Sequence, residues 1–287
     1  MRAARRTAAH YARCVTSTTR HVNARDGIPL LVREWRVEAG EPWASLLLVH
    51  GLAEHSGRYE HVGARFAAAG IETHAIDLRG FGASGGPRVW VNRWSELHDD
   101  LEERITALRA AAPERRLVLY GHSLGGLVCL GYVLDGRSEP DLLVLSAPAI
   151  SADIPAWQRA LVALVGRIAP RISIPNRLSG SQLSRDPAVG VDYFADPLNV
   201  HASTARFGVL AFAEQRRVAA ALDRLSIPTL VIHGGDDALV PTATSAVFEG
   251  RRGVTRQVFE GLRHETHNEP DRDRVLDAVV AWIRSAV

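Results

Sequence analysis

The chain has 287 residues, a formal net charge of +2 at pH 7 and an apolar fraction of 46%. This length is sufficient for one large domain with a complete hydrophobic core. The nearly balanced charge argues against a nucleic-acid-binding protein, and two cysteines are too few for a disulfide framework. No Cys/His cluster has the spacing of metal ligands and no glycine-rich loop has the ending of a P-loop, so we expect neither a metal nor a cofactor.

The first twenty residues differ in composition from the rest of the chain. They contain five arginines and no acidic residue, and they lack the continuous apolar segment of a secretory signal. We therefore predict that residues 1–20 form a disordered tail. No window approaches the roughly 18 unbroken apolar residues of a membrane-spanning helix, so we expect a cytoplasmic protein.

Strand and helix patterns alternate along most of the sequence. A hairpin is predicted over residues 21–37, with its turn at Asp26-Gly27, and a buried strand over residues 44–50. The alternation predicts an α/β fold with a mainly parallel sheet and helices on both faces. Further strands are predicted over residues 71–77, 117–120, 142–146, 229–233 and 255–259, and helices over residues 59–69, 94–108, from 127, up to 225, between the last two strands and from 271.

The alternation stops between residues 147 and 205. This segment contains six prolines and one apolar helix, predicted over residues 156–168. We predict that residues 147–205 form a cap inserted between the two parts of the core, residues 21–146 and 206–287.

The most informative stretch is Leu117–Gly126. Its start suits a buried strand, its end suits a helix, and the G-x-S-x-G pattern between them is typical of a nucleophile elbow. In such a tight turn Gly121 and Gly125 would provide room, and Ser123 would point out of the sheet. The next helix would then direct free amide groups at an oxyanion formed there. The alternative is a surface turn that holds an ordinary serine.

Partners for this serine are found in two later loops. A serine hydroxyl is a weak nucleophile near neutral pH, so it needs an imidazole base that a carboxylate orients. In proteins with this elbow the acid comes next in the chain and the histidine last, each on a loop after a strand. The loop after the next-to-last predicted strand contains Asp236 and Asp237, and the loop after the last strand contains His264 and His267. Spacing alone does not decide within either pair.

Seven motifs in order carry a family resemblance: HGLAEHSGRY at 50–59, DLRGFGASGG at 77–86, GHSLGG at 121–126, LSRDP at 183–187, DPL at 196–198, HGGDDALVP at 233–241 and GLRHE at 261–265. Together they resemble the monoacylglycerol lipase family of α/β-hydrolases, within the serine aminopeptidase S33-like group. The resemblance runs from about His21 to the C-terminus. It implies an α/β-hydrolase fold with an inserted helical cap.

The resemblance also assigns roles to single residues. It selects Asp237 and His264 as the partners of Ser123 in a catalytic triad. The backbone amides of Leu52 and Leu124 would form the oxyanion hole, although Leu124 stands where a methionine is common in this family.

The implied reaction is hydrolysis of a monoacylglycerol to fatty acid and glycerol through an acyl-enzyme. Glu54, Arg58, Tyr193 and His267 match positions that shape the polar end of the pocket, where glycerol would bind. The alternatives are a broad carboxylesterase, a lysophospholipase, a peptidase on the same scaffold, or a capped ligand-binding receptor with little turnover.

The cap helix determines the expected substrate class. An apolar tunnel under Trp157, Leu161 and Leu164 would favour a lipid ester, because each buried methylene contributes about 0.8 kcal/mol. The alternative is that these side chains only pack the cap onto the core. The same apolar face, with arginines nearby, suggests transient peripheral contact with a membrane or a lipid droplet.

Overall fold

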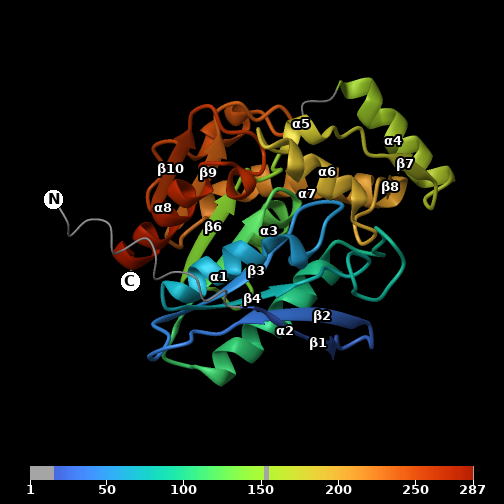
Figure 1. The fold of residues 1–287 in the computed structure, drawn as a ribbon. Helices are drawn as coiled ribbons and strands as arrows, with labels where there is room; N and C mark the ends of the chain where they lie inside the picture. The colour runs from blue at the N-terminus through green and yellow to red at the C-terminus, as the bar shows by residue number, and fades with distance from the viewer. Residues whose placement is uncertain (1–15, 152–154, 287) are drawn as a thin grey trace.

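An eight-stranded sheet with helices on both faces forms the core of the protein (Figure 1). The structure, a computed structural model, describes residues 16–151 and 155–286. The predicted α/β-hydrolase fold is confirmed. The strands of the sheet are β1 Thr18–Asn23, β2 Pro29–Trp35, β3 Ala44–Val49, β4 Ile71–Ile76, β5 Arg116–His122, β6 Leu142–Ser146, β9 Thr229–Gly234 and β10 Val254–Phe259.

The strands follow the order β1-β2-β4-β3-β5-β6-β9-β10. Strand β2 is antiparallel to β1 and β4, and every other neighbouring pair is parallel. The hairpin starts three residues before the predicted position, because Thr18 to Arg20 pair with Glu34 to Val32. Residues 18–20 therefore belong to the sheet, and most of the predicted tail lies outside the described residues.

The central strands are buried on both sides, which explains their predominantly apolar sequences. In β3, Leu47 and Val49 join one hydrophobic cluster, while Leu46 and Leu48 join the other. Helices α2, α3 and α7 cover the first face, and α1 and α8 cover the second. These helices are α1 Glu60–Ala68, α2 Ser95–Ala111, α3 Leu124–Leu134, α7 Ala205–Ala221 and α8 Arg272–Ser285.

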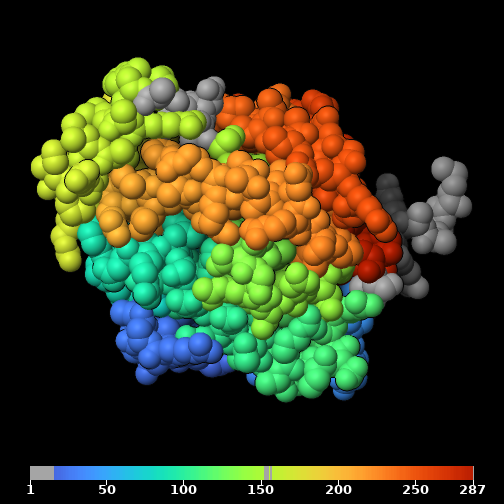
Figure 2. Space-filling view, turned by 180° about the vertical axis from the view of Figure 1, so that it is seen from behind, coloured from blue at the N-terminus to red at the C-terminus, as the bar shows by residue number. Residues whose placement is uncertain are grey.

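The inserted segment follows β6 and ends where α7 begins, and its helix α4 lies at the outer edge of the molecule (Figures 1 and 2). The sequence predicted α4 but neither the two shorter helices nor the two-stranded ribbon of this cap. Each of those elements has fewer than ten residues, too short for a clear periodic pattern. The cap contains α4 Ala156–Ile168, β7 Ser173–Pro175, α5 Gly180–Leu183, α6 Pro187–Ala195 and β8 Ala202–Thr204.

One predicted helix has a different form. Between β9 and β10 the described chain has a 3₁₀ helix, Thr242–Phe248, instead of an α-helix. Within the described ranges, no helix has both the length and the apolar character needed to cross a lipid bilayer.

Candidate active site

Ser123 occupies the turn between β5 and α3, as the sequence predicted. Its φ of 52° lies in the left-handed region, which is strained for a residue with a side chain. The turn also brings backbone groups very close together: a Cβ on Gly121 would lie 2.4 Å from the Gly125 carbonyl oxygen, and one on Gly125 only 2.2 Å from that of Val49. Glycine is therefore required on both sides of the serine.

His264 and Asp237 form a hydrogen-bonded pair at the ends of β10 and β9. The Nδ1 atom of His264 donates to Asp237 Oδ2 at 2.7 Å, and Asp237 Oδ1 accepts from the amides of Leu239 and Val240 at 2.9 Å each. Burial favours the neutral carboxyl group, but hydrogen bonds from His233 and His264 outweigh it and hold the pKa of Asp237 well below its usual value. The neighbouring Asp236 is exposed, so the geometry selects Asp237.

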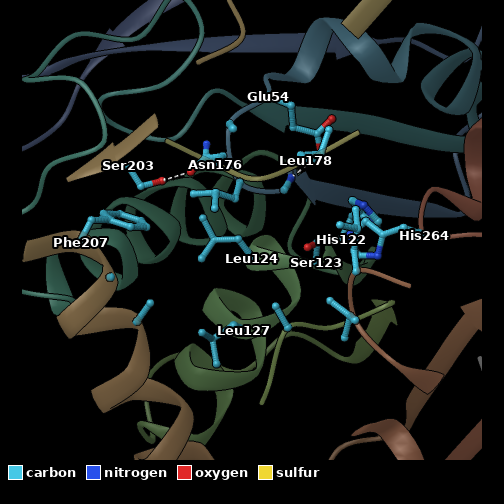
Figure 3. Close-up of a pocket in the computed structure, with 18 of the residues that line it drawn as sticks. Glu54, His122, Ser123, Leu124, Leu127, Asn176, Leu178, Ser203, Phe207 and His264 are labelled. Atoms are coloured by element: carbon cyan, nitrogen blue, oxygen red, sulfur yellow. Dashed lines mark hydrogen bonds between the residues drawn. The ribbon is translucent and has the colours of Figure 1, made fainter. Parts of the chain in front are cut away.

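The same pair determines the protonation of His264. Burial lowers the pKa of this imidazole, but the hydrogen bond and the charge of Asp237 raise it above its ordinary value. With Nδ1 occupied by Asp237, the other ring nitrogen is left to exchange a proton with Ser123. Both residues line one cavity, and Figure 3 shows them on the same side of it. Within the described residues no hydrogen bond yet joins them, and such contacts commonly tighten when substrate binds.

In the loop after β3, the His50 side chain fixes the orientation of the peptide that contains the Leu52 amide. His50 donates from Nδ1 to the Gly51 carbonyl oxygen at 2.8 Å, while its Nε2 accepts from the Leu78 amide at 2.9 Å. Burial lowers the pKa of His50, which keeps the ring neutral and suits this arrangement. The Gly51 carbonyl and the Leu52 N–H belong to one trans peptide and point in opposite directions, so the Leu52 amide is directed away from His50. No motif or spacing in the sequence indicated this role of His50.

A second amide lies at the start of α3. Leu124 is the first residue of that helix, so its N–H has no partner within the helix. Leu52 and Leu124 both line the cavity beside Ser123. The two N–H groups are suited to stabilise a developing negative charge on an oxygen.

The cavity lies between the core and the cap and has a volume of about 550 Å³. This volume is in the range of small-molecule sites. Figure 3 shows Ser123 and His264 together on one side and Phe207 on the other. The wall between them is mainly apolar and includes Leu127, Val162, Phe207, Ala211 and Phe212.

The family model described as serine aminopeptidase, S33, matches residues 40–271. The chain belongs to this family of α/β-hydrolases. A family relative, the monoacylglycerol lipase of Mycolicibacterium smegmatis, is 36% identical over 90% of this chain and 94% of its own length.

Solved structures in the family agree with the fold. The crystal structure of the Paleococcus ferrophilus monoacylglycerol lipase is 30% identical, covers 88% of this chain and 99% of its own, and has a TM-score of 0.76. A soluble variant of the Saccharomyces cerevisiae monoglyceride lipase, in complex with a substrate analog, has a TM-score of 0.86 over 96% of this chain and 97% of its own. At 20% identity, the second likeness concerns the fold alone.

The predicted glycerol-binding residues of this S33 family member fall into two groups. Glu54 and Tyr193 line the cavity, and the Tyr193 hydroxyl donates to the Ala53 carbonyl oxygen at 3.3 Å. Arg58 and His267 are not among the described residues that line the cavity, so a role for them in glycerol binding stays a prediction. Arg58 is held by carboxylates behind it, and His267 is fully buried with its ring stacked 4.7 Å from that of Tyr59.

The prediction for the cap helix is wrong. Trp157, Leu161 and Leu164 do not line the cavity, and they are 65%, 51% and 55% exposed. The inward face of α4 instead contains Val162, which lines the cavity, and Gly166, where a Cβ would lie 2.6 Å from a methyl group on α7. Apolar residues occur on both sides of this helix, so spacing alone could not show which side faces α7.

A different region contains a group of residues of the types that bind metals. Among the described residues, ligand atoms of Glu34, Glu72 and His74 lie within 4.8 Å of one another. Both carboxylates are already paired with arginines, Arg36 and Arg115. The group lines a second cavity that does not include Ser123, so it takes no part in the site described above.

Proposed function

We propose that the protein is a serine hydrolase that cleaves monoacylglycerols to fatty acid and glycerol through an acyl-enzyme. The observation that carries this proposal is the His264–Asp237 hydrogen bond beside a strained Ser123, at one side of an apolar cavity. The relatives named monoacylglycerol lipases support the substrate class.

The proposed mechanism follows from these positions. His264 takes the proton of Ser123 while the serine oxygen bonds to the ester carbonyl carbon. The amides of Leu52 and Leu124 bind the resulting oxyanion, and each donor contributes on the order of 100-fold to 1000-fold in rate. The protonated His264 then gives its proton to the leaving glycerol oxygen. Water, activated by the same imidazole, attacks the acyl-enzyme, and the proton returns to Ser123 as the fatty acid leaves.

The apolar wall supports a lipid ester over a short one. An acyl chain that packs against Leu127, Phe207 and Phe212 is transferred out of water. Each methylene buried there contributes about 0.8 kcal/mol to binding. A longer chain should therefore increase kcat/KM until the cavity is full.

A fluorophosphonate probe tests the nucleophile. We expect covalent labelling of the wild-type protein and none of Ser123→Ala, together with a loss of about a million-fold in kcat on monoacylglycerol. The control is the melting temperature of the variant, which should equal that of the wild type because Ser123 is a small residue at the cavity surface. Labelling that persists in Ser123→Ala would assign the nucleophile to another residue.

A substrate panel tests the ester class. Monoacylglycerols of increasing chain length should exceed short p-nitrophenyl esters, lysophospholipids and aminoacyl amides in kcat/KM. The amides are included because the family is described as serine aminopeptidases. A receptor with little turnover would give slow single labelling and no steady-state hydrolysis of any of these compounds.

We also propose that the outer face of α4 docks on a lipid surface from the cytoplasm. Trp157, Leu161, Leu164 and Ile168 are spaced by three or four residues and form one exposed apolar stripe. Arg167 in the last turn of the helix favours anionic headgroups. Monoacylglycerols themselves partition into membranes, so such contact would bring the cavity to its substrate.

Flotation with anionic vesicles tests this contact. The double variant Trp157→Ser, Leu161→Ser should lose most of the vesicle-bound fraction, since it removes much of the exposed apolar stripe. The matched control is Val247→Ser, which changes a side chain that is similarly exposed but lies outside the cap. Equal flotation of the double variant and the control would contradict the proposal.

A further inference from the structure

Both carboxylate oxygens of Glu54 accept hydrogen bonds from its own loop and from the short helix that follows. Its carboxylate is buried, and Oε1 accepts from the Gly51 amide at 2.6 Å and from the Tyr59 hydroxyl at 2.7 Å. Oε2 accepts from Arg58 Nη1 at 2.6 Å. The Gly51 amide directly precedes the peptide that contains the Leu52 N–H. Glu54 therefore holds the loop that presents the proposed oxyanion donor.

Glu265 has a corresponding role in the loop that contains His264, where it directly follows the histidine. Its carboxylate is buried and accepts two hydrogen bonds from Arg58, at 2.7 and 2.8 Å, and one from Asn268 Nδ2 at 2.7 Å. The Glu265 amide donates to the Leu183 carbonyl oxygen at 2.9 Å. The backbone next to His264 is thus held through the side chain of its neighbour.

Arg58 joins these two loops. Its guanidinium is almost completely buried, does not line the cavity and lies over the ring of Tyr193 at 5.0 Å from the centroid. We propose that the Glu54–Arg58–Glu265 group, here called the strut, positions the oxyanion loop against His264. This inference rests on the proposed hydrolase function and assigns to Glu54, Arg58 and Glu265 the role of positioning residues.

The charges of the strut agree with this role. Two carboxylates and one guanidinium leave one net negative charge close to the imidazole that must become positive during the reaction. Arg58 is the main reason why the pKa of Glu54 falls to about 2 in spite of burial, so the charge persists at neutral pH. Both Glu265 and Glu54 favour the protonated form of His264, after the larger contribution of Asp237.

The test separates positioning from substrate binding by using two esters. Glu265→Gln and Arg58→Lys are measured on a monoacylglycerol and on p-nitrophenyl butyrate, which has no glycerol. If the strut positions the loops, kcat should fall about 10-fold to 100-fold on both esters, with KM within about twofold. In Glu265→Gln the acid limb of the kcat/KM profile should also move to lower pH, because a negative charge near His264 is lost.

A matched control addresses stability. Asp100→Asn weakens another buried, doubly hydrogen-bonded ion pair, between Arg79 and Asp100 at 2.6 and 2.7 Å, which is outside the cavity. This variant should melt at a lower temperature yet keep kcat within about twofold of the wild type. Melting temperatures are recorded for all variants. If Glu265→Gln does not fold, the kcat and KM values of Arg58→Lys on the two esters test the proposal.

Two results would overturn the strut. If KM for monoacylglycerol rises while kcat on both esters is unchanged, the residues bind glycerol. If neither ester is affected beyond the Asp100→Asn control, the ion pairs only support the fold. Failure of the wild type to cleave any ester is a separate outcome that removes the proposed function itself.

Discussion

The Asp237–His264 pair is the clearest case in which a hydrogen bond outweighs burial at a single residue. A buried imidazole normally loses its proton more easily, yet the pKa of His264 is raised by its carboxylate partner. The base must be neutral to accept the proton of Ser123. Activity should therefore fall, as the pH decreases, at a higher pH than for an ordinary histidine.

The raised pKa of His264 predicts a kcat/KM profile whose acid limb has its midpoint above about 6.5, the usual histidine pKa. Asp237→Asn removes the cause of the shift and also the acceptor that fixes the Nδ1 proton, so kcat should fall about 10,000-fold. The residual activity should show its acid limb at lower pH. A wild-type midpoint below 6 would contradict this account of His264.

At the scale of elements, the packing of α7 against α4 determines the space for the acyl chain. Gly208 on α7 and Val162 on α4 both line the cavity. A Cβ added at Gly208 would lie 3.6 Å from Val162 Cγ1, which is ordinary contact distance. A small side chain therefore fits at position 208, whereas a longer one must occupy the cavity.

Gly208→Leu should shorten the preferred acyl chain. Excluding two methylenes removes about 1.6 kcal/mol of burial, so kcat/KM for the longest monoacylglycerols should fall on the order of tenfold relative to the shortest. Gly208→Ala is the matched control and should keep the wild-type chain-length profile, with higher stability from its better helix propensity. If the Leu and Ala variants have the same dependence of kcat/KM on chain length, position 208 does not form part of the acyl-chain wall.

At the scale of the whole molecule, burial keeps several histidine rings at and behind the site neutral. Burial lowers the pKa of His122 to about 3, and it lowers that of His267 well below its usual value. Neither ring nitrogen of His267 has a hydrogen-bond partner among the residues that the structure describes. Below pH 6.5 the unfolded chain binds protons that these folded rings do not, so stability falls with decreasing pH. His264 has the opposite shift and offsets part of this fall.

We predict that the free energy of unfolding is lower at pH 5 than at pH 7.5, as measured by urea titration. Each ring that stays neutral in the folded state costs about 2 kcal/mol at pH 5, since one pKa unit corresponds to 1.36 kcal/mol. His267→Leu should reduce the pH dependence by about that amount, because Leu has no group to titrate. An unchanged pH dependence in this variant would show that His267 does protonate in the folded protein.

The local pattern of residues was sufficient for the architecture and for the elbow. Apolar runs of four residues, 46–49 in β3 and 142–145 in β6, favour strands buried on both sides, and the two glycines around Ser123 allow a tight turn. Parallel strands place their following loops at one edge, so the order of serine, acid and histidine already indicated a meeting point. The choice of Asp237 and His264 within each pair needed the family resemblance, and in the structure a hydrogen bond joins these two residues.

Only the tertiary structure shows which residues far apart in the sequence contact each other. Arg58 and Glu265 are 207 positions apart, and nothing in their local spacing links a helix after the third strand to a loop after the last. The exposure of Trp157 and Leu161 likewise depends on how α4 packs against α7, since both sides of α4 are apolar. Sequence periodicity determines which residues share a face, whereas the partner of that face is determined by packing over the whole molecule.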